Sequence, residues 1–285
     1  MRKISILFML LLAAFSARAQ FLYRLDLNKS DQKAPSYILA SHKMGNPKDI
    51  APQRAAVRKV LGEVTDAVWD FSPLPDSLRV VDKSFFLHDG KTLKEVLSAA
   101  DYAKVNMLLR KYTGYDMTDA RTSARYGRMT PHAMAENLDQ LIYQKAHPDY
   151  NPHDSLNAYV LAMVQEAKIP VEGIWMSFKL AWRWDNEPME KQLGELHDVI
   201  NDDQARLKFL DWSLDGYRKG KLDETTTETA SMACGHKFCK RPGEWVFIYA
   251  EKQPTLFVLD AGELGGEWGV FRKLRDLGAT VTPVR

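Results

Sequence analysis

Two cysteines and one histidine near the end of the chain are spaced so that they could do chemistry. Cys234 and Cys239 are the only cysteines, and His236 lies between them. Thiolates and an imidazole in the spacing C-x-H-x-x-C could ligate a metal ion, although a structural zinc site needs a second cluster of ligands. In an oxidising compartment the two thiols would instead pair, and closing so short a loop is worth about 2 kcal/mol. We predict a Cys234–Cys239 disulfide, with a metal site as the alternative.

Other side chains with catalytic potential lack the necessary geometry or context. His197 and Asp198 are adjacent in the sequence. Neighbouring residues on a helix point about 100° apart, so these two cannot act as an acid–base pair. Ser155 and Ser231 lack the G-x-S-x-G sequence of a nucleophile elbow. Serine or thiol catalysis is therefore not predicted.

The first nineteen residues have the pattern of a secretory signal peptide. Arg2 and Lys3 precede an apolar run over residues 4–15, and Ala17 and Ala19 provide a small-x-small cleavage site. The run is shorter than the roughly 20 residues that a membrane span needs, and no later segment approaches that length. We expect cleavage after Ala19, which would leave a secreted or periplasmic protein without a transmembrane segment.

Composition limits the classes of partner. Cleavage would remove three of the 39 lysines and arginines, leaving 36 against 37 aspartates and glutamates, a formal charge of −1 in place of +2. A near-neutral chain lacks the excess positive charge with which proteins bind phosphate backbones, so no nucleic-acid partner is expected. Hydrophobic residues make up 45% of the chain and suffice for a core, and no repeat or linker divides it. We predict one domain over residues 20–285, with a protein or peptide as its candidate partner.

Strand and helix patterns at both ends of the mature chain indicate β-α-β order. Short apolar or alternating runs, typical of strands, are separated by amphipathic helical runs, and the first two strands form a predicted hairpin. The predicted strands cover residues 21–27, 36–40, 64–71, 255–259 and 280–284, and the predicted helices between them cover 50–61 and 269–277.

The middle third is predicted to be helical, and capping sequences mark where its helices begin. Thr92 with Glu95 is a capping box, and Thr130 followed by Pro131 opens another helix. Further predicted elements are a helix from residues 154–155 onward, a strand at 171–174, and helices over 188–200 and 203–217. The sequence therefore predicts an α/β fold, in which the N- and C-terminal parts build a mixed central sheet and the helical middle is an insertion.

Several short motifs occur in order along nearly the whole mature chain. Arg241 and Trp245 match an R-N-x-x-W element in which proline replaces the asparagine. The other motifs are Pro35-Ser36-Tyr37-Ile38, Gly90-Lys91-Thr92-Leu93, Ile169-Pro170-Val171-Glu172-Gly173, Phe257–Leu264 and Gly278–Val284. In this order they resemble the TraB/GumN family, exported or membrane-linked proteins that include relatives of the Tiki-type metalloproteases.

The resemblance implies a metal-dependent hydrolytic site. In the family, two G-x-x-H turns, each following a strand, combine with acidic residues at other strand ends. Neutral imidazoles and carboxylates can hold a divalent ion while one coordination position stays open. The ion then activates water or polarises a carbonyl group.

This chain departs from the family at both turns. The first turn is Ala40-Ser41-His42-Lys43, so Lys43 stands at the histidine position and His42 lies one position early. On an extended segment, a shift of one residue points the side chain to the opposite face, and a lysine ammonium must lose a proton before it can ligate. The second turn is Asp260-Ala261-Gly262-Glu263, in which Glu263 replaces the histidine.

Two acidic positions of the family differ as well. Asp70 stands near the place of a family glutamate, and Trp175 stands where the family sequence G-L-E-T has its carboxylate. We therefore predict a retained fold with a degenerate site, in a non-catalytic binding protein of the cell envelope that needs no cofactor. The alternative is an active metal-dependent hydrolase with a rebuilt site of His42, Asp70 and Glu263, whose oxygen-rich ligands would suit Mn²⁺.

Overall fold

The computed structural model describes residues 20–30, 32, 34–175, 185–222, 240–267 and 269–284. Contacts within the chain divide it into two compact units. We call them the sheet unit, made of Met1–Asp70, Leu156–Val171 and Ser213–Arg285, and the helical unit, made of Phe71–Ser155 and Glu172–Trp212. The predicted signal peptide lies outside the described residues, and folding of the chain as one domain stays a prediction.

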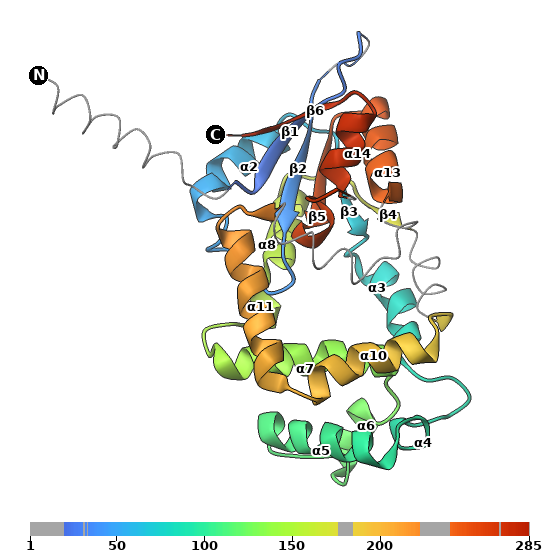
Figure 1. The fold of residues 1–285 in the computed structure, drawn as a ribbon. Helices are drawn as coiled ribbons and strands as arrows, with labels where there is room; N and C mark the ends of the chain where they lie inside the picture. The colour runs from blue at the N-terminus through green and yellow to red at the C-terminus, as the bar shows by residue number, and fades with distance from the viewer. Residues whose placement is uncertain are drawn as a thin grey trace, which may run out of the picture. The chain divides into compact units, whose positions relative to one another are not determined.

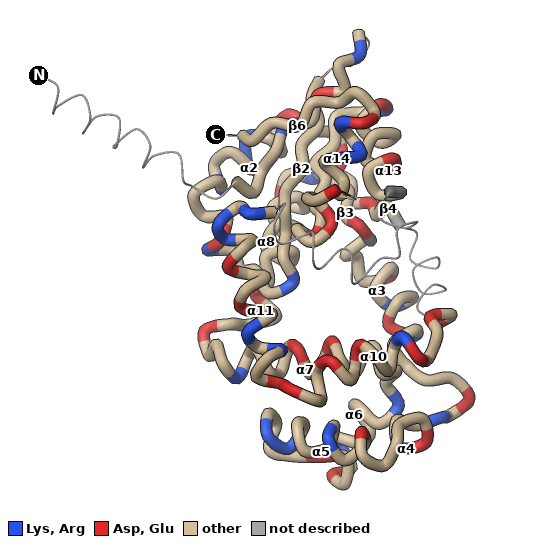
Figure 2. The backbone as a smooth tube through the Cα atoms, in the orientation of Figure 1, with Lys and Arg blue, Asp and Glu red and all other residues tan. Residues whose placement is uncertain are grey.

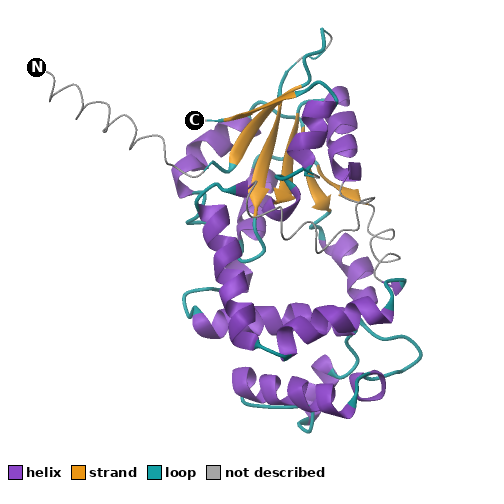
Figure 3. Ribbon diagram, in the orientation of Figure 1, coloured by secondary structure: helices purple, strands orange, loops and turns teal. Residues whose placement is uncertain are grey.

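A six-stranded mixed sheet is built from the two ends of the chain and one strand of its middle (Figure 1, Figure 3), in the order β4-β3-β5-β2-β1-β6. Its strands are β1 Leu22–Asp26, β2 Ser36–Ser41, β3 Asp66–Phe71, β4 Val171–Trp175, β5 Thr255–Asp260 and β6 Thr280–Pro283. All of β2 and all of β5 except its final aspartate are buried, as expected for central strands with continuous apolar runs. The predicted fold class, a mixed central sheet with a helical middle, is confirmed.

Strand directions follow from the pairing register. The strand β1 is antiparallel to β2, with Leu22 opposite Leu39, which confirms the predicted hairpin. It is also antiparallel to β6, with Leu25 opposite Val281. Both β2 and β3 run parallel to β5, and parallel neighbours must be joined by crossovers rather than by tight turns.

Helices of the sheet unit supply these connections. They are η1 Ala51–Gln53, α2 Arg54–Leu61, α8 Leu156–Glu166, the last part of α11 (Asp203–Arg218), α13 Lys240–Lys252, η4 Ala261–Glu263 and α14 Val270–Asp276. The helices α13 and α14 lie side by side (Figure 1). In α14, Val270, Phe271 and Leu274 are buried, whereas Leu277, which follows the helix and is expected on the same face, is 38% exposed.

Two long helices, α7 (Pro131–Ala146) and α10 (Met189–Ile200), pack side by side in the helical unit (Figure 1). Together with α5 (Ala99–Thr113) they enclose an apolar core that includes Met134 and Leu196. Apolar residues recur at helical spacing, so each helix buries one side. The remaining elements of this unit are α3 Pro75–Asp82, η2 Lys83–Phe85, α4 Leu93–Val96, α6 Ala120–Tyr126, η3 Pro152–Asp154 and the first part of α11.

The predicted helix starts are formed by side-chain caps. The Thr92 backbone N–H donates to Glu95 Oε2 over 2.7 Å, which completes the capping box of α4. Thr130 Oγ1 accepts from the Ala133 N–H at the start of α7. The helix α5 ends at Gly114, whose φ of 85° lies in the left-handed region that glycine adopts without strain.

Charge is mixed along the described elements of both units, where acidic and basic positions are interspersed (Figure 2). This distribution agrees with the small formal net charge of the sequence, +2. In the part of the chain that the structure describes, no helix has the length and apolar character needed to cross a membrane.

Candidate functional site

The carboxyl ends of three parallel strands meet at one edge of the sheet. Ser41 at the end of β2 lies opposite Asp260 at the end of β5, and β3 runs parallel to β5. Ligands of open α/β sheets bind at such edges. His42 follows β2, Asp70 is the penultimate residue of β3, and Glu263 lies in the 3-10 turn after β5, so the sequence prediction assigns all three to this edge.

His42 is held by two hydrogen bonds within the fold. Its side chain is buried, with the residue 6% exposed. Nδ1 accepts from the Met44 backbone N–H over 3.1 Å, and Nε2 lies 3.0 Å from Ser213 Oγ of α11. Because Nδ1 is an acceptor, the proton of the neutral ring is on Nε2, which donates to Ser213. Both ring nitrogens of His42 are therefore engaged.

Electrostatics keep this imidazole neutral. Burial lowers the pKa of His42, and the charges of Lys43 and Arg218 lower it further. The carboxylates of Asp260 and Asp49 oppose this shift without reversing it. An imidazolium would also turn Nδ1 into a donor and break its bond with the Met44 N–H.

Tyr217, one helical turn after Ser213, closes the space beside His42. Its side chain is fully buried, its ring centroid lies 5.5 Å from that of His42 and 4.7 Å from that of Phe21, and its hydroxyl donates to the Ala40 carbonyl over 3.1 Å. Burial, followed by the charges of Asp49 and Asp260, raises the pKa of Tyr217 well above its ordinary value. The phenol stays protonated and acts as a structural donor.

Carboxylates at this edge serve structural roles. Asp49 pairs with Arg218 over 2.8 Å and accepts from the Asn46 N–H, also over 2.8 Å. Asp260 Oδ1 accepts from the Gly262 N–H over 2.8 Å and so caps the turn that carries Glu263. Glu263 is half-buried, and its Oε2 atom is shielded from solvent.

Of the other predicted site residues, Lys43 and Trp245 are exposed. Lys43 lies in the turn after β2, beside the buried His42. Trp175 ends β4, Arg241 lies in the first turn of α13, and Trp245, on the same helix, is 40% exposed. Cys234 and Cys239, with the predicted disulfide, lie outside the described residues.

The three predicted ligands at the strand edge, His42, Asp70 and Glu263, do not bring their ligand atoms together. Within the described ranges, one group of three His, Cys, Asp or Glu side chains has ligand atoms within 4.8 Å of one another, and it is His132, Glu187 and Glu195 of the helical unit. His42, Asp70 and Glu263 do not form such a group as they stand. The assignment of these three residues to a metal ion stays a prediction.

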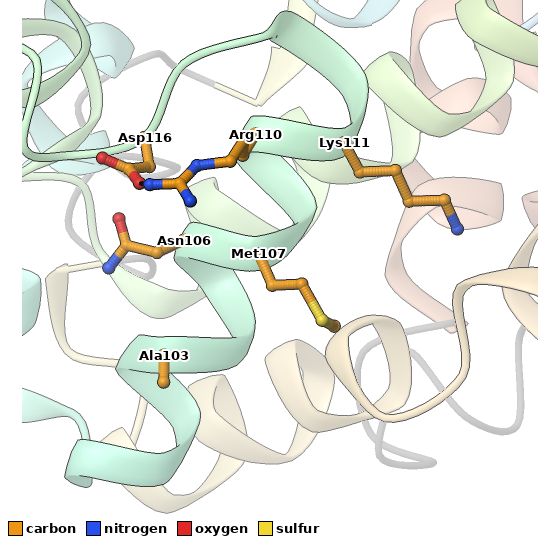
Figure 4. A pocket seen from close by; sticks show the side chains of 6 residues that line it. All are labelled: Ala103, Asn106, Met107, Arg110, Lys111 and Asp116. Atoms are coloured by element: carbon orange, nitrogen blue, oxygen red, sulfur yellow. Dashed lines mark hydrogen bonds and ion pairs between the residues drawn. The ribbon is translucent and has the colours of Figure 1, made fainter.

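A shallow pocket of about 490 Å³ in the helical unit also lacks catalytic chemistry (Figure 4). Asn106 Oδ1 accepts from the Met117 N–H over 2.8 Å, and Arg110 pairs with Asp116. Hydrogen bonds from Thr118, with a smaller effect from Arg110, lower the pKa of Asp116, which therefore stays ionised. Asn106, Arg110 and Asp116 thus hold the helix α5 to the loop after it, and Lys111 of the lining pairs with Asp203 of α11.

Comparison with known proteins identifies the family. The model of the TraB/PrgY/gumN family matches residues 26–283, nearly the whole chain. The chain belongs to the TraB/PrgY/gumN family. No curated protein and no solved structure matches it. The resemblance predicted from the motifs is therefore confirmed.

The hydrogen-bond partner of His42 on α11 in this TraB/PrgY/gumN chain cannot be predicted from the sequence. Ser213 is 171 positions away in the sequence, and nothing near His42 indicates it. A partial signal exists, because Ser213 and Tyr217 are spaced i, i+4 and share a helix with the buried Leu210 and Leu214. That spacing could place them on the inner side of α11 but not beside a particular strand.

We expect the variant His42→Gln to be less sensitive to acid than the wild type. The folded-state pKa of His42 lies below its ordinary value of 6.5, so the neutral ring contributes stability that is complete above pH 6.5 and is lost as pH falls toward the folded pKa. Urea unfolding at about pH 7.5 and about pH 5.5 brackets the unperturbed histidine pKa. Other titrating groups, including His132 with its raised pKa, are common to both proteins. An equal loss of stability between about pH 7.5 and about pH 5.5 in the wild type and in His42→Gln would contradict this account of His42.

Proposed function

We propose that this protein is an exported, non-catalytic member of the TraB/PrgY/gumN family that acts by binding a protein or peptide partner in the cell envelope. The observation that carries the proposal is the state of His42, whose two ring nitrogens already have hydrogen-bond partners in the fold. The strand edge lies where the family has its metal site, but in this protein the side chains there are packed and hydrogen-bonded within the fold. Export rests on the sequence of residues 1–19.

Metal ligation by His42 would require local rearrangement. The lone pair on Nδ1 is directed at the Met44 N–H, and Nε2 carries the proton that is donated to Ser213. Freeing Nδ1 would leave a backbone N–H in a buried turn without its acceptor, which costs about 1–3 kcal/mol. The neighbouring Lys43 offers an ammonium group at neutral pH, which repels a cation.

The charges at the edge also do not fit a divalent ion. A cation site needs carboxylates that can turn toward an ion, but Asp49 is held both by Arg218 and by the Asn46 backbone N–H. Asp260 is engaged in capping the turn before Glu263. These residues therefore favour a hydrogen-bonded, packed edge over a metal centre.

A calorimetric titration of the mature protein with Mn²⁺, Co²⁺ and Zn²⁺ tests the proposal against a Glu263→Ala variant. We expect the two proteins to give the same heats, because Glu263 is not a metal ligand in this account. Replacement of Lys43 and Glu263 by histidine in a double variant restores the family ligands and provides the positive control. Binding by the wild type that disappears in Glu263→Ala would contradict the proposal.

The second candidate function is an active metal-dependent hydrolase. It is favoured by the buried Oε2 atom of Glu263, which lies in the turn after β5, at the edge that also carries Asp70. Oxygen ligands of this kind suit Mn²⁺. Cleavage of a peptide library by the wild type with Mn²⁺, abolished in Glu263→Ala, would establish this function in place of the proposed one.

A further inference from the structure

A cluster of ligand-type side chains in the helical unit is not used by the proposed function. His132 is the second residue of α7, Glu195 lies on α10, and Glu187 lies two residues before α10 begins. One ligand atom from each lies within 4.8 Å of the others. His132 and Glu195 are 63 positions apart in the sequence. The packing of α7 against α10 brings them together with Glu187.

The cluster is partly shielded from solvent. The side chains of His132 and Glu195 are 21% and 33% exposed, and that of Glu187 is 9% exposed. His132 Nδ1 contacts Glu195 directly, and Lys191 contacts Glu187 and lies 3.7 Å from Glu195. Two carboxylates are thus balanced by a lysine ammonium and a histidine proton. A single divalent ion could replace both positive charges, since Lys191 is 40% exposed and can turn to solvent.

A buried amide oxygen beside the cluster adds an independent indication. Gln192 is 5% exposed, and its Nε2 donates to the Glu187 carbonyl over 2.9 Å. Its Oε1 atom is buried and has no hydrogen-bond partner among the described residues. A buried oxygen without a protein partner is usually satisfied by a water, a ligand or an ion. Gln192 lies one turn before Glu195 on α10, and residues so spaced share a helix face.

We propose that His132, Glu187 and Glu195 form a binding site for one divalent transition-metal ion, with Gln192 Oε1 as an additional oxygen ligand. One imidazole and two carboxylates are a common ligand set for Zn²⁺ and related ions. The site is separate from the strand edge of the sheet unit, so it does not restore the hydrolytic site expected from the family. An ion here would join α7 to α10 and stabilise the helical unit.

Carboxylates dominate the surroundings of His132. Burial lowers the pKa of His132, but the hydrogen bond with Glu195 and the charges of Glu195, Glu136 and Glu187 outweigh it, so the pKa is raised. The ammonium of Lys191 lies on the same side of α10 and contacts both glutamates of the cluster. The excess of carboxylates around the imidazole favours a cation at this position.

The test is calorimetry with Zn²⁺ on chelator-treated protein, residues 20–285, at about pH 7.5. We expect one Zn²⁺ per chain, with affinity reduced at least about tenfold in Glu195→Gln and in His132→Gln. The matched control is His147→Gln, because His147 also lies at an end of α7 and pairs with one carboxylate, Asp211, over 2.7 Å. Its affinity for Zn²⁺ should equal that of the wild type.

Two further measurements make the outcome decisive. Circular dichroism shows that each variant folds, and Zn²⁺ should raise the Tm of the wild type and His147→Gln but not of Glu195→Gln. A variant with serine at Cys234 and Cys239 excludes binding by the cysteines and should keep full affinity. Absence of Zn²⁺ binding, or binding unchanged in Glu195→Gln and His132→Gln, would overturn the inference. Binding lost only in Glu263→Ala would overturn both this inference and the proposed function.

Discussion

Replacing Arg206 by alanine should lower the free energy of unfolding by about 3–5 kcal/mol. Asp139 on α7 is 1% exposed at its side chain, and Arg206 on α11 holds it with two hydrogen bonds of 2.6 Å each. Removing the guanidinium leaves the Asp139 carboxylate buried in the helical unit without this cation, and burying a charge without its counter-ion is costly. Urea unfolding followed by circular dichroism measures the change.

An exposed ion pair is the matched control for Arg206→Ala. Lys219, just after α11, and Asp215 on α11 lie 2.6 Å apart, but their side chains are 59% and 57% exposed. Exposed pairs contribute about 0–1 kcal/mol, so Lys219→Ala should change the unfolding free energy by less than about 1 kcal/mol. A loss of the same small size in Arg206→Ala would contradict the structural role of the buried pair.

The variant Tyr217→Ala should lower the unfolding free energy by about 3–5 kcal/mol, as large-to-small replacement of a buried aromatic does. The Tyr217 side chain is fully buried against Phe21 and His42, so its removal leaves a cavity at the strand edge. The substitution also removes the hydroxyl group that donates a hydrogen bond to the Ala40 carbonyl. Denaturant unfolding reports the total effect.

Two further variants separate packing from hydrogen bonding at this position. Tyr217→Phe keeps the ring and removes only the hydroxyl, so it should cost about 1 kcal/mol. Tyr115→Ala removes a tyrosine that is 62% exposed and should change stability by less than about 0.5 kcal/mol. If Tyr217→Ala were as mild as Tyr115→Ala, the strand edge would not be the packed region described here.

Much of the fold can be predicted because its signals are local. Capping by Thr92 and Thr130 and the stop at Gly114 depend on residues within one turn, and each is present in the structure. The helix α6 is not predicted, since only Thr122 and Tyr126 of its seven residues are buried and its apolar spacing is weak. The helix α13 is not predicted either, because Pro242 and Gly243 in its first turn disfavour a helix interior.

One local prediction at the helix α11 is wrong in detail. An amphipathic helix is predicted over residues 203–217, and the helix is present as Asp203–Arg218. Because Trp212 is large and apolar, we expect it on the buried side with Leu210, yet it is 41% exposed, while Leu210 and Leu214 are buried. Size and hydrophobicity alone do not settle which side of a helix faces the core, since tryptophan is often only partly buried.

The position of the candidate site can be predicted from the sequence, but the hydrogen bonds of its side chains cannot. The motifs predict that the chain departs from its family at the ends of β2 and β5, and the order of His42 and Lys43 predicts their opposite exposure, which the structure has. The hydrogen bond to Ser213 depends on a contact between distant parts of the chain, which one sequence does not encode locally. The same applies to His132 and Glu195, where the i, i+4 spacing of Glu187, Lys191 and Glu195 indicates only surface ion pairs.

The most direct test of the central claim is the tautomer of His42, measured by long-range ¹H–¹⁵N NMR of the mature protein with and without Zn²⁺. A His42→Gln variant assigns the signals. We predict a neutral ring with the proton on Nε2 and an unprotonated Nδ1 that accepts a hydrogen bond, both unchanged by Zn²⁺, even where the signals of His132 respond. A His42 nitrogen that binds Zn²⁺ directly would contradict the account and show that the strand edge still holds a metal.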